Sequence, residues 1–139
     1  MHKLKGYCEC KKVSFEINQK IKYFSHCHCS QCRRTHGSAF ASFIEVDKSC
    51  FKYNSGNEHI KSFSSSKLCQ RIFCQCCGSN IMFLDETKSN KYYVSVGAID
   101  GSPKLPKAHH VFVGSKASLF EINDNLKQHD KLPSAFKNE

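Results

Sequence analysis

The chain has 139 residues, 40% of them hydrophobic, which is enough for one globular domain with its own core. No apolar stretch approaches the roughly 20 residues of a membrane helix, and the first residues lack the apolar run and cleavage site of a signal peptide, so we expect a cytoplasmic protein without membrane attachment. The formal charge of +9 is compatible with an anionic partner, but the lysines are scattered from Lys3 to Lys137 rather than gathered in a stripe. A solvated basic surface is therefore the expectation, and nucleic-acid binding is not.

Strand-like patterns begin at residue 13 and recur along the chain. Val13, Phe15 and Ile17 alternate with polar residues, as in a half-buried strand. Further segments with strand-like apolar content are 40–46, 81–84, 92–96 and 110–113. Turn signals rich in Gly, Asn, Asp, Ser and Pro separate them at 54–56, 100–103 and 114–115.

The sequence contains one convincing helix candidate, over residues 31–36. Ser30 is a suitable N-cap for it, and Gly37 is a suitable end. No repeat, linker or low-complexity tract interrupts the chain, although residues 134–139 have the composition of a frayed end. We predict a mainly β fold that forms a single domain over residues 1–139, with an ordered core over about 4–135.

Ten cysteines fall in tight groups instead of being spread through the chain. The groups are Cys8-Glu-Cys10, Cys27-His-Cys-Ser-Gln-Cys32 and Cys74-Gln-Cys-Cys77, the last followed by Gly78. Two cysteines one residue apart are poorly placed to bridge each other, but both can point at one metal ion. The spacing therefore favours zinc over disulfides.

Counting ligands divides these cysteines into two sites. Cys8, Cys10, Cys74 and Cys77 complete a four-thiolate structural zinc site, in which Gly78 supplies the positive φ of a zinc knuckle. Cys76 is an alternative to Cys77, but the position of Gly78 favours Cys77. Cys50 and Cys69 are expected to be small buried hydrophobic residues.

Cys27, Cys29 and Cys32 remain, and three protein ligands with a free fourth position are typical of a catalytic zinc. The alternative is that a histidine closes this second site and makes it structural. The histidines available for that role are His26, His28, His36, His109 and His110. The expected cofactor content is two Zn²⁺ per chain.

These motifs, with the residues around them, resemble the family of glutathione-dependent formaldehyde-activating enzymes, which also contains centromere protein V. The resemblance covers about residues 4–135. Its matching elements are Gly6-Tyr-Cys-Glu-Cys10, Cys27-His-Cys-Ser-Gln-Cys-Arg-Arg-Thr-His-Gly-Ser-Ala-Phe40, Arg71-Ile-Phe-Cys-Gln-Cys-Cys-Gly-Ser79, Val96-Gly-Ala-Ile-Asp100, Pro106-Lys-Ala-His-His-Val-Phe-Val113 and Ser115-Lys-Ala-Ser118.

The resemblance implies an Mss4-like β-tent of twisted antiparallel sheets with a short helix, stabilised by zinc. It also implies the same two-zinc division and a carbon–sulfur lyase reaction that joins glutathione and formaldehyde into S-(hydroxymethyl)glutathione. The chain departs from the family pattern at Lys11, where Gly is usual, at Leu119, where Trp is common, and over 125–129. None of these positions is a predicted metal ligand, so the departures bear on the substrate and not on the zinc sites.

A mechanism follows from the second site. A free thiol has a pKa near about 8.5, and binding to zinc at the open position would make it a nucleophilic thiolate. Glutathione also carries two carboxylates, which Arg33 and Arg34 are placed to clamp, with ordinary surface charge as the alternative for either arginine. Proton-handling roles are open to His36, Asp100, His109 and His110.

Two other functions compete with this enzyme. One is a zinc-stabilised binding module without catalysis, with an anionic partner, although the basic residues are dispersed. The other is a methionine sulfoxide reductase, whose Gly-Trp-Pro signature is absent because the chain has no Trp. The small-molecule partner expected is a thiol, in the first place glutathione, and the sequence leaves the oligomeric state undetermined.

Overall fold

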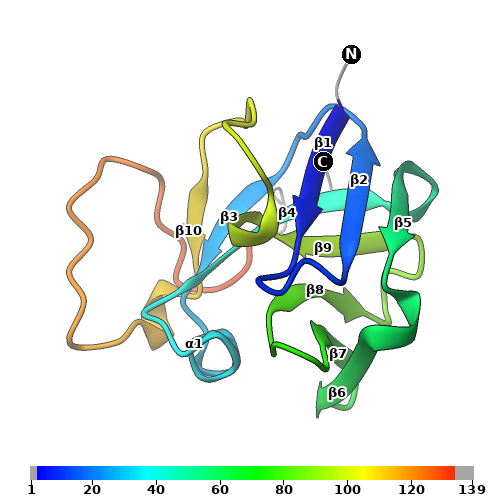
Figure 1. Cartoon of the computed structure of the whole chain (residues 1–139). Helices are drawn as coiled ribbons and strands as arrows, with labels where there is room; N and C mark the ends of the chain where they lie inside the picture. Colours follow the sequence, from blue (N-terminus) through cyan, green and yellow to red (C-terminus); the bar gives the residue numbers. More distant parts are fainter. Residues whose placement is uncertain (1–2, 134–139) are drawn as a thin grey trace.

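Two β-sheets make up most of the fold, which we describe for residues 3–133 from a computed structural model (Figure 1). The predicted frayed end at 134–139 lies outside these residues. The fold is mainly β with one short α-helix, as the sequence predicts. Over the described residues, no helix is long and apolar enough to cross a membrane.

The smaller sheet has three antiparallel strands in the order β1-β2-β5. They are β1 (Lys3–Tyr7), β2 (Ser14–Asn18) and β5 (Phe51–Ser55). The predicted strand at 13–17 is β2, displaced by one residue. Its apolar side chains Phe15 and Ile17 are buried, and the residue opposite Phe15 is Gly6. A Cβ atom on Gly6 would lie 2.3 Å from the Phe15 ring, so only glycine allows this close pairing.

The larger sheet has seven strands in the order β10-β3-β4-β9-β8-β7-β6. Their bounds are β3 (Phe24–Cys27), β4 (Ala41–Asp47), β6 (Ile60–Ser66), β7 (Cys69–Cys74), β8 (Asn80–Asp85), β9 (Lys91–Ser95) and β10 (His109–Val111). The predicted strands at 40–46, 81–84, 92–96 and 110–113 correspond to β4, β8, β9 and β10. The sheet is antiparallel except that β10 runs parallel to β3, so it is mixed rather than wholly antiparallel.

The predicted helix forms as α1 (Ser30–His36) and ends at Gly37, which has a left-handed φ of 58°. The predicted N-cap is wrong by one residue: Cys29 caps the helix, and Ser30 is its first residue. The Cys29 Sγ atom accepts a hydrogen bond from the Cys32 amide at 3.3 Å, which satisfies a donor of the first turn. The cap therefore joins two of the predicted metal ligands.

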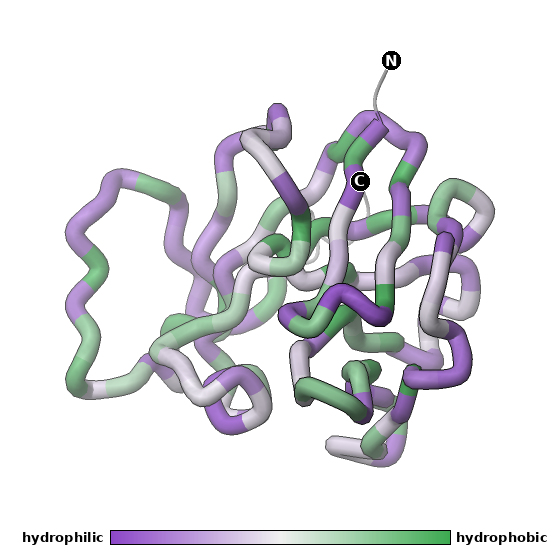
Figure 2. The backbone as a smooth tube through the Cα atoms, in the orientation of Figure 1, coloured by the Kyte–Doolittle hydropathy of each residue, from purple (hydrophilic) through white to green (hydrophobic). Residues whose placement is uncertain are grey.

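β4 separates two hydrophobic clusters because its side chains are buried on both faces of the sheet. Ile44 and Val46 belong to the larger cluster, together with Phe15 and Ile17 of the three-stranded sheet. Phe43 belongs to a smaller cluster with Cys27, Cys32, Ala41 and Val111. Figure 2 shows hydrophobic segments along the central strands and hydrophilic segments in the peripheral loops.

Candidate metal centres and the adjoining cavity

Cys8, Cys10, Cys74 and Cys77 form one cluster, with their sulfur atoms all within 4.8 Å of one another. The Sγ atoms of Cys8 and Cys10 are 3.5 Å apart, and those of Cys10 and Cys74 are 3.9 Å apart. Four sulfurs around a zinc ion at about 2.3 Å would be about 3.8 Å apart, whereas a disulfide needs about 2.05 Å. The cluster therefore fits a tetrahedral metal ion and not a pair of disulfides.

Two tight turns hold this cluster. Gly78 has a φ of 78°, as predicted, and its amide donates to the Cys74 carbonyl at 2.7 Å. Lys11 has a φ of 65° and donates its amide to the Cys8 carbonyl at 2.9 Å. Lys11 thus occupies a left-handed conformation that glycine adopts without strain, at the position where the family resemblance implies a glycine.

Backbone and hydroxyl groups surround the sulfurs of the four-cysteine cluster. The Val13 amide donates to Cys8 Sγ at 3.3 Å, and the Ser79 hydroxyl lies 3.2 Å from Cys77 Sγ. This Ser79 hydrogen bond is the main reason that the pKa of Cys77 is lowered to about 5. A thiol that is already thiolate at neutral pH is ready to bind a metal ion.

Cys27, Cys29 and Cys32 form the second cluster, also with all sulfurs within 4.8 Å of one another. Cys27 ends β3, Cys29 caps α1, and Cys32 lies in the first turn of α1. Hydrogen bonds from the Cys27 and Cys32 thiols lower the pKa of Cys29 to about 2. The pKa of Cys27 is raised, chiefly by its hydrogen bond to Cys29. One thiolate is therefore favoured before any metal binds, and a divalent cation would favour the other two.

Over the described residues, no histidine joins either cluster. His28 lies between two of the cysteines in sequence, but its ring points into a separate buried network. Its Nε2 atom is 2.8 Å from His110 Nδ1, and His110 Nε2 is 3.0 Å from Asp124 Oδ2. His26 Nδ1 lies 2.7 Å from the Ser42 hydroxyl. These contacts engage one nitrogen of each ring, and neither ring joins the sulfurs of the second cluster. The Nδ1 atom of His28 has no hydrogen-bond partner among the described residues.

The remaining residues proposed to carry protons do not belong to either cysteine cluster. His36 packs edge-on against Phe43, and burial, followed by the charge of Arg71, lowers its pKa to about 4. The rings of His109 and His129 stack, with 2.9 Å between His109 Nδ1 and His129 Nε2. Asp100 is exposed and accepts a hydrogen bond from the Tyr7 hydroxyl at 3.3 Å.

A cavity of about 240 Å³ opens directly onto the three-cysteine cluster. Most of its wall is apolar or aromatic, and it comes from strands that are far apart in sequence. It is lined by Tyr23, Ser25, Cys27, Cys29, Cys32, Phe43, Glu45, Arg71, Phe83, Asp85, Lys88, Tyr93, Val111, Phe112 and Leu132. All three cysteines of this cluster thus line the same cavity, whereas among the cavities found in residues 3–133 the four-cysteine cluster contributes only Cys8 to a wall.

Arg71 is the residue of this cavity that the sequence analysis missed as a functional group. Its side chain is buried, with 5% exposure, and its Nη1 atom donates to Cys32 Sγ at 3.5 Å. Nε donates to the Ser65 hydroxyl at 3.1 Å, and the guanidinium lies 5.1 Å from the centre of the Phe83 ring. Two signals in the sequence were available: Arg71 is a charged residue just before the apolar residues that lead to Cys74, and it begins one of the motifs that carry the family resemblance.

Arg33 and Arg34 lie in the last turn of α1 and are not among the residues that line this cavity. Arg34 is exposed, whereas Arg33 is half-buried and its Nε atom has no hydrogen-bond partner among the described residues. Their role as a carboxylate clamp stays a prediction. Of the three arginines in the chain, the one that contacts a cluster sulfur is Arg71.

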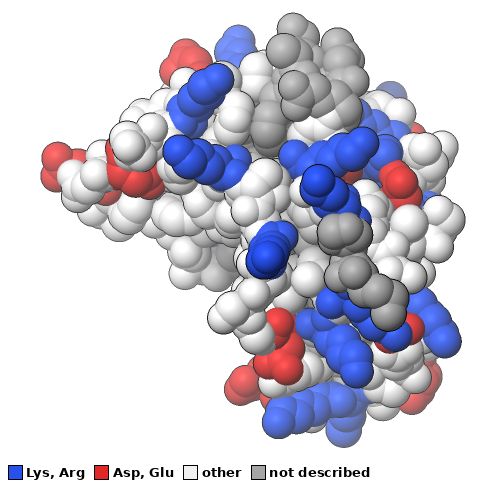
Figure 3. Space-filling view, turned by 90° about the horizontal axis from the view of Figure 1, so that it is seen from above, with Lys and Arg blue, Asp and Glu red and all other residues white. Residues whose placement is uncertain are grey.

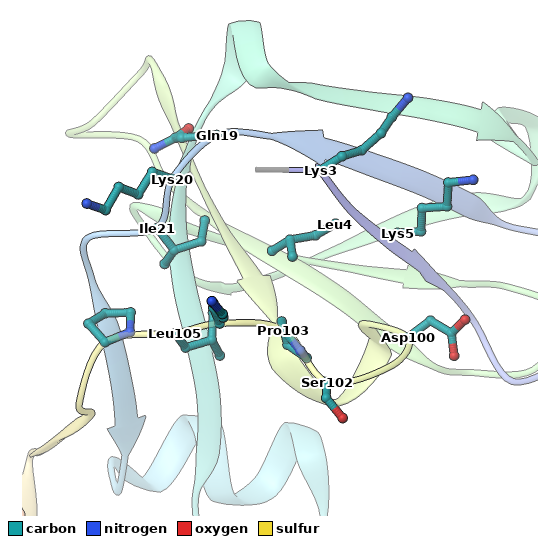
Figure 4. Close-up of a pocket in the computed structure, with 12 residues that line it drawn as sticks. Lys3, Leu4, Lys5, Gln19, Lys20, Ile21, Asp100, Ser102, Pro103 and Leu105 are labelled. Carbon is teal, nitrogen blue, oxygen red and sulfur yellow. The ribbon is translucent and has the colours of Figure 1, made fainter. Parts of the chain in front are cut away.

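Two larger cavities lie elsewhere on the molecule. One, of about 640 Å³, reaches both Cys8 and His36. The other, of about 690 Å³, has an apolar centre at Leu4, Ile21 and Leu105. Figure 4 shows that Lys3, Lys5 and Lys20 extend away from the centre of this second cavity, and its lining contains no cysteine or histidine. Neither of these two cavities is lined by more than one cysteine of a cluster.

The fold and the site define a mainly β protein with two cysteine clusters that could hold metal ions, and all three cysteines of one cluster line a cavity. Within this class, the chain belongs to the family of glutathione-dependent formaldehyde-activating enzymes, whose sequence model matches residues 3–115. The matched region includes all seven cysteines of the two clusters.

Individual proteins from a yeast and a bacterium are similar to this chain. An uncharacterised lyase of Schizosaccharomyces pombe is 26% identical in an alignment of 136 residues that covers 91% of this chain and 97% of that protein. A crystal structure of a Rhodobacter sphaeroides protein superposes with a TM-score of 0.61 and 24% identity, covering 70% of this chain and 89% of that chain. The second similarity supports the fold.

Proposed function

We propose that this protein is a zinc-dependent, carbon–sulfur lyase-like enzyme of the S-(hydroxymethyl)glutathione synthase type. The observation that carries the proposal is the cavity beside Cys27, Cys29 and Cys32, because it leaves room for a substrate sulfur at the metal. Membership of the glutathione-dependent family and the lyase name of the yeast relative support the same class of reaction.

In the proposed reaction, the sulfur of glutathione forms a bond to the carbonyl carbon of formaldehyde. The thiol proton ends on the carbonyl oxygen, so atoms and charge balance without a redox partner. A zinc ion on the three cysteines would supply a fourth coordination position and lower the pKa of the thiol bound there. Breaking the same bond in reverse is the lyase direction.

The chain's own residues prepare the site for this chemistry. β3 and α1 hold the three sulfurs on a rigid frame, and the Cys29 cap fixes the start of the helix. The aromatic rings of Phe43 and Phe83 pack edge-to-face at 4.7 Å and keep one wall of the cavity dry. A dry wall would strengthen the attraction between a zinc ion held by the three cysteines and the sulfur of a thiolate. Arg33 and Arg34 are the proposed contacts for the glutathione carboxylates outside the cavity.

The alternative of a binding module with an anionic partner has less support. Figure 3 shows Lys and Arg side chains in several separate groups on one face, with Asp and Glu between them. A nucleic-acid surface usually carries a continuous basic patch or stripe. The dispersed charge is therefore better explained as a solvated surface.

Calorimetry with glutathione and S-methylglutathione tests the proposed function. Glutathione should bind the zinc-loaded protein more tightly, because a methylated sulfur cannot become a thiolate. Its affinity should fall below neutral pH, because the thiol must release a proton to bind the metal. Cys29→Ser should abolish this preference, whereas Cys50→Ser, a cysteine outside both clusters, should keep it. Equal affinities for the two ligands, or glutathione binding that survives Cys29→Ser, would refute a thiol site at this metal.

A further inference from the structure

Arg71 is a buried positive charge that needs a negative partner. A guanidinium stays protonated in proteins, and removing it from water is costly unless an anion compensates it. With 5% exposure, Arg71 has little contact with bulk water. The compensating negative charge should therefore come from a group in contact with Arg71.

Carboxylates do not provide the compensation. Over residues 3–133, no ion pair joins Arg71 to an acidic side chain. Glu45 and Asp85 line the same cavity, but they are engaged elsewhere. Glu45 accepts from the Tyr93 hydroxyl at 2.9 Å, and Asp85 accepts from the Thr87 hydroxyl at 2.6 Å.

The group in contact with Nη1 of Arg71 is the sulfur of Cys32, at 3.5 Å. Three cysteine thiolates and one Zn²⁺ carry a net charge of −1, which weakens the attraction of the metal for another anion. A positive charge in direct contact with one of the sulfurs brings the whole centre to zero. A neutral centre in a low-dielectric cavity can accept a thiolate more readily than an anionic one.

We propose that the Arg71 guanidinium is the counter-charge of the three-cysteine metal centre and that it sets the preference of this centre for an anionic fourth ligand. The effect on the metal stands on the contact with Cys32 alone, and the effect on the fourth ligand rests on the proposed function. Arg71 is a positioning residue here, because it acts through Cys32. Ser65 and Phe83 hold the guanidinium in place, the first by a hydrogen bond and the second by stacking.

The test changes the side chain of Arg71 and measures the affinity of the second site for zinc and for a fourth ligand. Arg71→Met and Arg71→Gln remove the charge, Arg71→Lys keeps it on a shorter donor, and Lys61→Met removes an exposed charge from the neighbouring strand β6. Competition with a chelator measures the zinc affinity of the second site. Cobalt-substituted protein, followed by its absorption bands, measures the binding of 2-mercaptoethanol, an anionic ligand once bound, and of imidazole, a neutral one. Neither probe has a carboxylate, so a carboxylate clamp cannot account for any change.

Both neutral variants should bind the second zinc ion and 2-mercaptoethanol about 10- to 100-fold more weakly, the range of a hydrogen bond to a charged group. Imidazole binding should change much less, Arg71→Lys should be intermediate, and Lys61→Met should match the wild type. If Arg71 had only a structural role, its replacement would weaken the binding of 2-mercaptoethanol and of imidazole equally. A variant that still binds zinc at the four-cysteine cluster is folded. If both neutral variants lose this zinc ion, the comparison of the two probes is made in Arg71→Lys.

Two results would overturn the proposal. They are wild-type zinc affinity in either folded neutral variant, and equal losses of affinity for 2-mercaptoethanol and imidazole in any folded variant of Arg71. A wild-type protein that binds no thiol, but loses zinc affinity on Arg71→Gln, would refute the proposed function and leave Arg71 as the counter-charge of the metal.

Discussion

The Sγ atoms of Cys10 and Cys74 lie 3.9 Å apart although 64 residues separate them. Cys10 belongs to the turn between β1 and β2, and Cys74 ends β7 in the other sheet. A metal ion between them would tie the three-stranded sheet to the seven-stranded sheet at one edge of the larger hydrophobic cluster, to which Cys8 and Cys74 themselves belong. The four-cysteine cluster is therefore placed to hold the two sheets together.

Cys77→Ser should greatly destabilise the protein because it removes one of the four ligands. Structural zinc contributes about 10–16 kcal/mol to the folding of small zinc-finger peptides at neutral pH, so the variant should aggregate or melt at a much lower temperature. Cys76→Ser is a matched control, since Cys76 is adjacent, exposed and outside the cluster. Thermal unfolding followed by circular dichroism checks both. A soluble Cys77→Ser protein with the melting temperature of the wild type would contradict the assignment.

Purified protein should contain close to two zinc ions per chain, and one of them should exchange faster. The faster ion should be the one on Cys27, Cys29 and Cys32, because this cluster has three ligands and adjoins a cavity. Elemental analysis during chelator treatment should show two phases of metal loss, and Cys29→Ser should remove the fast phase. A single tightly bound zinc ion, even after metal supplementation, would argue against two sites.

Lys11→Gly should stabilise the protein relative to Lys11→Ala. The left-handed φ of 65° at this position costs a residue with a Cβ atom about 1–2 kcal/mol, of which the greater freedom of glycine in the unfolded chain offsets about 0.5–1 kcal/mol. Both variants lose the contact of the Lys11 amino group with the Tyr7 ring, so their difference isolates the backbone. Chemical denaturation should give a higher free energy of unfolding for Lys11→Gly, by about 1 kcal/mol or less. Equal stabilities, or a more stable Lys11→Ala, would show that the turn carries no such strain.

His36 should make the protein less stable as the pH falls from about 6.5 to about 4. Burial lowers its pKa in the folded state from 6.5 to about 4, so over this window the unfolded chain takes up a proton that the folded protein does not. Above the window both states are neutral and the contribution is absent. His36→Gln removes the titration but keeps a polar side chain.

The stability of the wild type relative to His36→Gln should therefore decrease over the same window. Both proteins should be measured with zinc in excess, because release of the metal at low pH would itself lower their stability. A difference that stays constant from neutral pH to pH about 4 would show that the folded state protonates His36 normally.

Strong local patterns in the sequence were sufficient for much of the fold. The alternation of Val13, Phe15 and Ile17 predicts β2, and Gly37 predicts the end of α1, because each pattern is read over a few residues. The strands that the sequence analysis did not predict are β1, β3, β5, β6 and β7. β1 consists of Lys3–Tyr7 with a glycine inside it, and β6 is an edge strand whose residues are mostly exposed, so neither has a clear apolar period.

The sequence by itself also determined the grouping of the seven cysteines, because short spacing forces neighbouring thiols toward one point and ligand number limits how the groups combine. Only the tertiary structure decided what surrounds the second group. The histidines beside Cys27 and Cys29 point into a network with His110, and Arg71 reaches Cys32 from another strand. These choices depend on the pairing of strands that are distant in the chain, which fixes where each side chain is buried and which charge it meets. No local pattern carries that information.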